Sequence, residues 1–379
     1  MSGTHAAVSP AIILGRTALH DGRSADEERC ATPSRDTHSS GPQLPSRVAG
    51  PPLQSRVAGP PLQSRVASPP LPSRIASWSR ERRLTSRDIA RARRRLGGTT
   101  RPRSRSITFA RDWLFRRWYW YVNRIDTHGE VRFLNYGYAD DEWPALDVAD
   151  ERDRYCIQLY RHVAQAVSLR DQDVVEIGCG RGGGLAWVAK TFAPATALGL
   201  DLEPGAVRFC NRTYHRPGLA FRQGDAQRLP LDDACCDAVL NVESSHRYTD
   251  LPAFLAETRR ILRPGGHLLL ADYRYDYEMP EFRRDLASCG LTLESEEDIT
   301  DGVATALRRD DARRRRLVMR MIPRFARGLA LNFAGAVGSP CYEKFAAHAS
   351  IYLRCVLRKD GADAARAVTA ADGGCGCAR

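Results

Sequence analysis

Residues 174–184 read V-V-E-I-G-C-G-R-G-G-G, and this stretch decides the fold of the chain. Its opening residues Val174, Val175 and Ile177 are apolar and β-branched, which is typical of a short buried parallel strand. The glycines that follow permit a sharp turn and a close approach of the backbone to a ligand. Residues 185–192 have the apolar pattern of a helix, whose N-terminal N–H groups would point at the turn. Together these segments predict a nucleotide-binding βα unit.

The glycine turn alone does not identify the nucleotide. Gly178, Gly180 and Gly183 fit the G-x-G-x-x-G spacing of a dinucleotide fold. Glu176, Gly178 and Gly180 equally fit the E-x-G-x-G loop of enzymes that use S-adenosylmethionine (SAM). A carboxylate suits the ammonium and sulfonium groups of SAM better than it suits a pyrophosphate. A glycine turn that binds no ligand is the remaining alternative at this point.

Around this unit the chain alternates between strand-like and helix-like segments. Strands are expected near 172–177, 195–200, 219–223, 237–242 and 266–271, and helices near 183–192, 204–214 and 251–262. This alternation predicts an α/β fold with a doubly wound parallel sheet. A helix is expected from about Glu151 to Val167. Residues 351–357, which alternate as I-Y-L-R-C-V-L, are expected to add a late strand at the end of the sheet.

Composition divides the 379 residues into four regions. Residues 1–105 are rich in Pro, Ser and Arg and repeat the nonapeptide S-R-V-A-G-P-P-L-Q, so we expect a disordered extension there. Residues 106–170 are expected to form an aromatic N-terminal helical cap. Residues 171–358 are expected to form the main domain, with a substrate-side helical region at 280–350. Residues 359–379 are expected to form a flexible tail.

The net charge of +12 is concentrated ahead of the predicted domain. Residues 78–117 contain fourteen arginines against three acids, whereas the rest of the chain beyond them is close to neutral. This basic segment leads into the aromatic residues from Trp113 to Tyr121, and its role has several interpretations. It could contact an anionic membrane surface, serve as an organelle-targeting leader, or be a solvated tail. Nucleic-acid binding is disfavoured because the main domain is nearly neutral.

The eleven cysteines show neither the paired C-x-x-C spacing of a zinc site nor a disulfide framework. We therefore expect a cytoplasmic protein in a reducing compartment, with no metal at its site. No apolar run approaches the roughly 18 residues that a membrane span requires.

Further motifs follow the glycine turn in a fixed order. Asp201 ends the second predicted strand, about twenty residues past the glycines, where an acid accepts hydrogen bonds from ribose hydroxyls. Gly224-Asp225-Ala226 follows the third strand, Leu229-Pro230 precedes the fourth, and L-R-P-G-G at 262–266 leads into the fifth. This succession resembles the class I SAM-dependent methyltransferases, in which the acid of the G-D-A position contacts the adenine amino group. The resemblance implies their seven-stranded Rossmann-like sheet.

Four longer motifs narrow the resemblance: F-L-N-Y-G-Y (133–138), E-I-G-C-G-R-G-G-G (176–184), V-L-N-V-E-S-S-H-R-Y (239–248) and L-R-P-G-G-H-L-L-L-A-D-Y-R (262–274). With them the chain is similar to the phthiotriol/phenolphthiotriol dimycocerosate methyltransferases, which O-methylate a hydroxyl of a long polyketide lipid. The similarity extends over about residues 113–358. It implies SAM as the cofactor and a lipid or polyketide small molecule as the acceptor. The residues predicted to bind the cofactor are Glu176, Gly178, Cys179, Gly180, Gly182, Asp201, Leu202, Asp225, Ala226 and Asn241.

Two polar residues are the predicted catalytic pair. His246 lies just past the fourth strand and Asp272 ends the fifth, and the carboxyl ends of neighbouring parallel strands line a ligand crevice. The carboxylate would orient the imidazole, which would take the proton of the acceptor hydroxyl. Glu243 is a weaker candidate for the base.

The predicted function is SAM-dependent O-methylation of a hydroxylated lipid or polyketide. C-methylation of a sterol or quinone-type lipid is the nearest alternative. Modification of RNA through the basic arm is the alternative from a different class.

Overall fold

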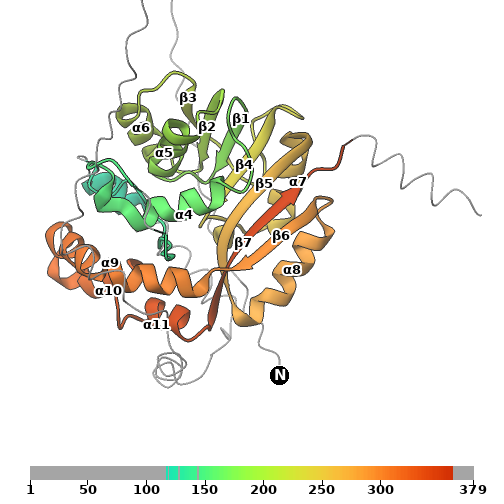
Figure 1. Ribbon diagram of the computed structural model, residues 1–379. Helices are drawn as coiled ribbons and strands as arrows, with labels where there is room; N and C mark the ends of the chain where they lie inside the picture. Colours follow the sequence, from blue (N-terminus) through green and yellow to red (C-terminus); the bar gives the residue numbers. More distant parts are fainter. Residues whose placement is uncertain (1–116, 118, 127–128, 143–144, 362–379) are drawn as a thin grey trace, which may run out of the picture. The chain divides into compact units, whose positions relative to one another are not determined.

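The computed structural model describes residues 117, 119–126, 129–142 and 145–361 (Figure 1). All of them belong to one unit of the chain, Pro70–Arg379. The predictions for the extension 1–105, for Trp113 and for the tail beyond 361 lie outside the described residues.

Seven strands form one sheet in the order β3-β2-β1-β4-β5-β7-β6. They are β1 Asp173–Ile177, β2 Thr196–Asp201, β3 Leu219–Gln223, β4 Cys236–Val242, β5 Leu262–Tyr275, β6 Thr292–Asp298 and β7 Ser350–Arg358. From β3 to β5 all neighbours are parallel, whereas β7 is antiparallel to both β5 and β6. From β1 the chain adds β2 and then β3 on one side of β1, and it then crosses to the other side of β1 to form β4. The carboxyl ends of β1 and β4 therefore form the switch point where doubly wound sheets bind their ligands.

Helices cover both faces of this sheet (Figure 1). They are α4 Arg154–Ala164, α5 Gly183–Phe192, α6 Pro204–Thr213, α7 Leu251–Ile261, α8 Met279–Ser288, α9 Thr300–Met321, α10 Arg327–Phe333 and α11 Pro340–Ala346. Short 3₁₀ turns are η2 Glu151–Asp153, η3 Ser245–Arg247, η4 Asp276–Glu278 and η5 Arg324–Ala326. One buried core joins the sheet to α4, α5, α6, α9 and α11, and a second joins it to α7 and α8. Residues 119–125 are also helical.

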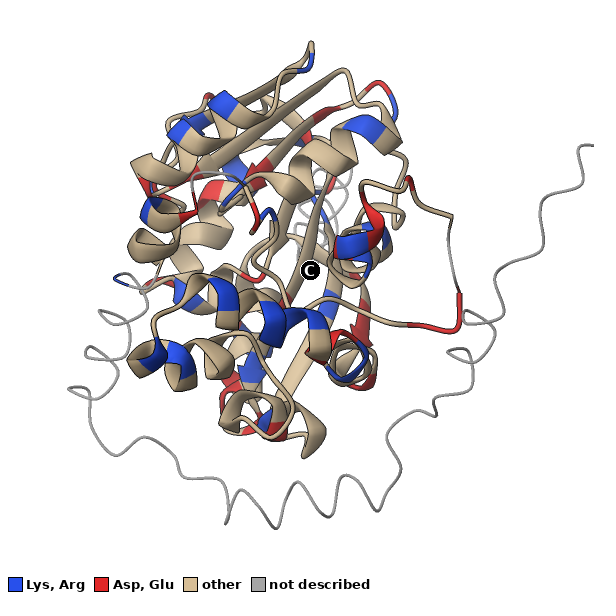
Figure 2. Ribbon diagram, turned by 90° about the vertical axis from the view of Figure 1, so that its left-hand side faces the viewer, with Lys and Arg blue, Asp and Glu red and all other residues tan. Residues whose placement is uncertain are grey.

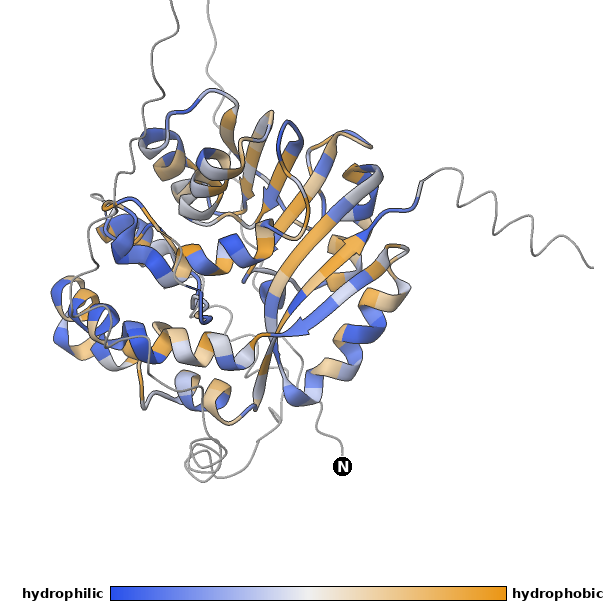
Figure 3. Cartoon of the chain, in the orientation of Figure 1, coloured by the Kyte–Doolittle hydropathy of each residue, from blue (hydrophilic) through white to orange (hydrophobic). Residues whose placement is uncertain are grey.

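The strands supply both cores by simple alternation. In β4, Leu240 belongs to the core under α4 and α5, whereas its neighbour Val239 belongs to the core under α7 and α8. In β5, Leu269 likewise belongs to the core under α4 and α5, and Leu268 belongs to the core under α7 and α8. Because successive side chains point to opposite faces, a strand that is covered on both sides is apolar at most positions. In Figure 3 the central strands are largely orange, the hydrophobic colour, with blue interruptions.

The five predicted parallel strands and the three helices between them are confirmed, and the helix predicted from about Glu151 begins as η2 and continues as α4. The expected position of the last strand is wrong. Residues 350–358 lie between β5 and β6, so the sheet ends at β6, which the sequence did not predict. The segment T-L-E-S-E-E-D has no apolar alternation because it is an exposed edge. Its glutamates pair with arginines such as Arg358 and Arg354, a charged edge that discourages pairing with another chain.

Among the described helices, none is long and apolar enough to cross a bilayer. The eight cysteines of the described residues are all free thiols.

Candidate active site

The glycine turn after β1 needs its glycines for two reasons. Gly178, Gly180 and Gly182 have φ angles of +76°, +54° and +72°, a left-handed conformation that other residues rarely adopt. A Cβ atom at Gly178 would also overlap with the Ser244 side chain, which lies after β4. The Gly180 N–H donates to Asp201 Oδ2 at 2.8 Å, so the end of β2 holds the turn in place.

The ends of β2 and β3 place polar and apolar groups along one rim. Asp201 also accepts from the Glu203 N–H at 2.9 Å, and burial raises the pKa of its carboxyl. Leu202 beside it is 48% exposed, which is unusual for so large an apolar side chain. Asp225 is exposed on the loop after β3, with Ala226 buried behind it. A carboxylate, an apolar surface and a second carboxylate in this order fit a ribose and an adenine ring.

Three other residues predicted to bind the cofactor are buried within or beneath the turn. Glu176 is completely buried and accepts from the Tyr160 hydroxyl at 2.6 Å. Burial raises the pKa of Glu176 to about 7. Asn241 is also fully buried and donates to the Ile177 carbonyl oxygen at 2.9 Å, and Cys179 is 5% exposed. The predicted role of these three residues in cofactor binding stays a prediction.

His246, in η3 after β4, and Asp272 of β5 are brought together. Asp272 does not end the strand as predicted, because β5 continues to Tyr275 in its pairing with β7. Asp272 Oδ1 lies 2.7 Å from His246 Nδ1, and Asp272 Oδ2 accepts from the Ser245 hydroxyl at 2.6 Å and from the His246 N–H at 2.8 Å. Arg274 Nη1 lies 3.4 Å from the same Oδ2. Because a carboxylate only accepts hydrogen bonds, Nδ1 carries the proton and the lone pair lies on Nε2. The imidazole ring also packs on Tyr273, with ring centroids 4.4 Å apart.

The pKa shifts of this pair favour a neutral imidazole beside an ionised carboxylate. Burial lowers the pKa of His246 to about 4, although the neighbouring Asp272 opposes the shift. Burial alone would raise the pKa of Asp272, but His246 and Arg274 outweigh it and hold the pKa below its usual range. At neutral pH, His246 therefore has an unprotonated nitrogen that could accept a proton.

Glu243 lies close by in a strained conformation. Its φ of +51° is unusual for a residue other than glycine. Oε1 accepts from the Tyr136 N–H at 2.7 Å and from the Tyr352 hydroxyl at 3.0 Å. Burial raises the pKa of Glu243 to about 8. The raised pKa favours the protonated form of Glu243 at neutral pH, so its carboxyl is less available to accept a proton than His246, and its contacts make it an anchor for the 133–138 loop.

These groups line one end of a cavity of about 150 Å³. Glu243, His246, Arg247 and Tyr273 form its polar end at the sheet. Tyr119 belongs to the same end, since Arg247, Glu243, Asp201 and Asp272 all act on its pKa, which burial raises. Its apolar end is formed by the side chains of Val122, Ile125, Leu317, Val318, Met321, Ile322, Ala330 and Phe333. Charged residues also line the cavity, namely Glu130, Arg132, Asp153, Arg313 and Arg314.

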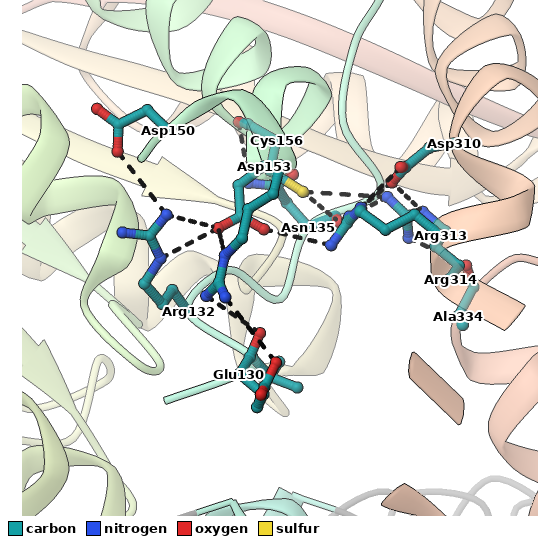
Figure 4. A network of polar contacts seen from close by, with 12 residues as sticks. Glu130, Arg132, Asn135, Asp150, Asp153, Cys156, Asp310, Arg313, Arg314 and Ala334 are labelled. Atoms are coloured by element: carbon teal, nitrogen blue, oxygen red, sulfur yellow. Dashed lines mark hydrogen bonds and ion pairs between the residues drawn. The ribbon is translucent and has the colours of Figure 1, made fainter. Parts of the chain in front are cut away.

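A network of ion pairs holds the walls of this cavity together (Figure 4). Asp153, only 3% exposed, accepts from Arg132 Nη2 at 2.8 Å and from Arg313 Nη1 at 3.2 Å. Arg314 donates to the Tyr136 carbonyl oxygen at 2.8 Å. Since Arg313 and Arg314 belong to α9, the network fixes that helix against the loop before α4.

Sequence reasoning missed several of these contacts. Ser245 and Arg274, which hold Asp272, and Tyr136, which holds Glu243, all lie within the quoted motifs. The contact between Tyr136 and Glu243 could not be predicted because the two residues are 107 positions apart in the sequence. Arg313 and Arg314 carried no such signal, because they belong to an arginine-rich run outside the quoted motifs.

Comparisons with known proteins bear on the family of this chain. A family model described as a methyltransferase domain matches residues 175–270. The chain is 38% identical over 236 residues to the phthiotriol/phenolphthiotriol dimycocerosates methyltransferase of Mycobacterium tuberculosis, covering 61% of this chain and 86% of that protein. It is 43% identical over 212 residues to a fatty-acid O-methyltransferase of Mycolicibacterium smegmatis, covering 51% of this chain and 77% of that protein.

Solved structures support the same fold. A candidate sarcosine dimethylglycine methyltransferase from Galdieria sulphuraria superposes with a TM-score of 0.50 at 14% identity, covering 63% of this chain and 98% of that structure. At this identity the likeness concerns the fold alone, and it agrees with the predicted Rossmann-like sheet. By the match to the mycobacterial relatives, this chain belongs to the class I SAM-dependent methyltransferases of the phthiotriol/phenolphthiotriol dimycocerosates methyltransferase family.

Proposed function

We propose that this methyltransferase methylates a hydroxyl oxygen of a lipid-like acceptor. The observation that carries the proposal is the cavity, which has His246 at its polar end and a wall of aliphatic and aromatic side chains at the other. A hydroxylated alkyl chain fits both ends at once. The names of the mycobacterial relatives, a phthiotriol dimycocerosates and a fatty-acid methyltransferase, support a lipid class of acceptor.

The rim beside the glycine turn is the proposed SAM site. Asp201 has acceptor capacity left on both oxygens for ribose hydroxyls, Leu202 offers an apolar surface for the adenine, and Asp225 is placed for its amino group. When bound, SAM supplies a methyl group on a positively charged sulfur. The turn from Gly178 to Gly182 would bring the backbone close enough to hold it.

His246 would act on the acceptor. As the hydroxyl oxygen forms its bond to the methyl carbon, Nε2 takes the hydroxyl proton, and the electron pair of the broken S–C bond stays on sulfur. The resulting imidazolium is stabilised by the Asp272 carboxylate at Nδ1. Alignment of the two reactants contributes about 7–11 kcal/mol at best, and a positioned base contributes about 10²–10⁴ in rate.

A carboxyl oxygen is the second candidate acceptor group. Arg247 lines the polar end of the cavity, and its positive charge contributes to lowering the pKa of His246. Such a charge would also attract a carboxylate, and one of the mycobacterial relatives is named a fatty-acid O-methyltransferase. A carboxylate is already deprotonated and needs no base. Removing His246 should therefore slow methylation of a hydroxyl but not of a carboxylate, which separates the two candidate acceptor groups.

Binding of S-adenosylhomocysteine tests the proposed SAM site. Asp201→Ala and Asp225→Ala are each expected to weaken binding by about 10–100-fold, because hydrogen bonds to charged groups contribute roughly 1.5–3 kcal/mol. Isothermal titration calorimetry measures this, with Asp232→Ala, which removes an exposed acid before β4, as the unaffected control. Tight binding of NADH together with no response to S-adenosylhomocysteine would overturn the assignment.

Filling the apolar end tests the acceptor site. Leu317→Trp should shorten the longest alcohol that is methylated at the wild-type rate, because the larger ring occupies space in the cavity. Met319→Trp is the matched control, since Met319 lies two residues further along α9 and is 44% exposed. The measurement is kcat/KM over a series of short, water-soluble alcohols of increasing length. Equal chain-length profiles for both variants would place the acceptor elsewhere.

A further inference from the structure

The C-terminal end of α9 and the turn and helix that follow are strongly basic. From Ala312 to Tyr342 the chain contains seven arginines and no acidic residue. Arg316 and Arg324 are exposed, and none of the described residues forms an ion pair with either. Arg320 is 62% exposed and pairs with Glu130. Figure 2 turns this side toward the viewer and shows Lys and Arg gathered on the helices of its lower half.

Large apolar side chains are exposed among these arginines. Phe325, at the middle of the turn η5, is 92% exposed, Met319 is 44% exposed and Leu329 is 37% exposed. The helix at 119–125 packs on the same end of α9 through Tyr121 and Ile125. It adds Trp120, which is 43% exposed and lies under the guanidinium of Arg117 at 4.8 Å. Most of the exposed large hydrophobic side chains of the described residues are therefore in this one region.

We propose that this surface, the α9–α10 tip formed by Met319, Arg316, Arg324, Phe325 and Leu329, docks on an anionic lipid bilayer. Apolar side chains surrounded by arginines suit the boundary between charged headgroups and acyl chains. The positive charge complements the negative surface of such a bilayer. A nucleic acid would be attracted by the arginines but would leave Phe325, Met319 and Leu329 without a partner.

The acceptor cavity lies directly behind this tip. Val318 and Ile322 line the cavity, while Met319 on the same turn of α9 is exposed, so one helix separates the two surfaces. The cavity of about 150 Å³ is smaller than the roughly 300–1,000 Å³ of pockets that enclose whole ligands. A long lipid would thus place only its reactive part inside, and the rest would stay in a bilayer beneath the tip. This link to turnover rests on the proposed function, whereas docking itself does not.

Hydrogen–deuterium exchange of the full chain, with mass-spectrometric readout, tests the docking surface. Vesicles of phosphatidylglycerol and phosphatidylcholine in equal parts are expected to slow exchange in peptides that cover 316–329. Peptides of the edge strand β6 should be unaffected. Because the readout is local, binding through the basic segment before residue 117 cannot imitate it. Unchanged exchange at 316–329 on bound vesicles would overturn the proposal, as would protection there by RNA and not by vesicles.

Two variants and two matched controls complete the test. Arg324→Glu should lower the vesicle partition coefficient by about 30-fold, since each charge near an anionic surface contributes about fivefold and two are changed. Phe325→Asp should abolish the protection of 316–329. Arg222→Glu and Leu293→Asp change an exposed arginine on β3 and a 43% exposed leucine on β6, and should leave both readouts unchanged. If vesicles protect residues 316–329 from exchange but no lipid is methylated, the docking surface is confirmed and the proposed function is refuted.

Discussion

Replacing His246 with alanine is expected to lower the turnover number on an alcohol acceptor by about 10²–10⁴-fold while leaving SAM binding unchanged. The reason is that Nε2 is the unprotonated nitrogen of a ring that lines the acceptor cavity, whereas Nδ1 is held 2.7 Å from Asp272. His246 belongs to neither the glycine turn nor the rim at Asp201 and Asp225, so the affinity for S-adenosylhomocysteine should stay at the wild-type value. Single-turnover kinetics under saturating SAM measures the effect.

The Asp272 carboxylate should matter only through the ring that it orients. Asp272→Asn preserves the shape of the side chain but removes the charge that stabilises the imidazolium, so its loss should approach that of His246→Ala. The double variant should be hardly slower than the worse single variant, as for residues that act as one unit. Asp272→Ala is a poorer test, because it would also remove the carboxylate that faces Arg274 and accepts from Ser245.

The pH dependence gives an independent signature of the same base. An unperturbed histidine titrates near pH 6.5, and a base with that pKa would lose activity below about pH 6–7. Since burial lowers the pKa of His246 to about 4, the wild-type rate should instead hold from neutral pH to about 5 and fall below it. Between these two pKa values the unfolded chain binds a proton that the folded chain does not, so stability also falls as the pH falls. Circular dichroism at each pH separates the two effects.

Two outcomes would contradict this assignment in different ways. If His246→Ala retains near-wild-type turnover on alcohols and the same acidic limb, His246 is not the base. If it retains turnover only on fatty acids, the acceptor is the carboxylate that Arg247 would attract, and no base is required. If the wild-type rate falls with a midpoint near pH 6.5, the imidazole is more hydrated during turnover than in the structure.

The parallel half of the sheet could be predicted because burial on both faces leaves a local signal. Val174 and Val175 point into different cores, so an apolar run is required and is visible in the sequence. The edge strand β6 leaves no such signal, since its face is charged and its order in the sheet depends on pairing with β7, over fifty residues later. The place of β7 between β5 and β6 is likewise a long-range choice that no local pattern encodes.

In the site, too, some contacts could be predicted from the sequence and others could not. His246 and Asp272 could be predicted to meet because they follow or lie near the carboxyl ends of two neighbouring strands, and they lie in hydrogen-bonding contact. The position of Glu176 beneath the turn could not be predicted, because it depends on Tyr160 of α4 approaching from the face of the sheet. The spacing of the glycines shows where the backbone turns, but it does not show which side chains point at the ligand.

A buried ion pair behind the glycine turn carries the second large expected effect. Arg181 and Asp126 have side chains that are 0% and 1% exposed, with Nη2 and Oδ2 2.9 Å apart. Arg181 also donates to the Val131 carbonyl oxygen at 2.6 Å and to Asn123 Oδ1 at 2.9 Å, and its guanidinium lies 3.6 Å from the ring centroid of Phe209. The pair therefore joins the turn to the helix at 119–125, which lines the cavity.

Asp126→Ala is expected to lower the free energy of unfolding by about 3–5 kcal/mol, because it leaves the guanidinium of Arg181 buried without its counter-charge. The N–H groups of Glu130 and Val131 also lose the carboxylate that accepts from them at 2.9 and 2.7 Å. Glu294→Ala is the matched control, since it breaks a pair with Arg358 in which the two side chains are 38% and 36% exposed. That loss should be at most about 1 kcal/mol. Urea unfolding followed by circular dichroism measures both.

A double-mutant cycle identifies the cause. If the cost of Asp126→Ala comes from a stranded charge, then adding Arg181→Met should recover part of it, because a buried charge without a partner costs more than an apolar side chain in the same place. If the cost comes only from the lost N–H contacts of the 129–131 loop, the double variant should instead be less stable than Asp126→Ala alone. In both cases Tyr119 and Val122 should lose their fixed position along the cavity, so the KM for the acceptor should rise more than the Kd for S-adenosylhomocysteine. A stable Asp126→Ala variant with wild-type KM would show that the pair neither stabilises the fold nor positions the cavity wall.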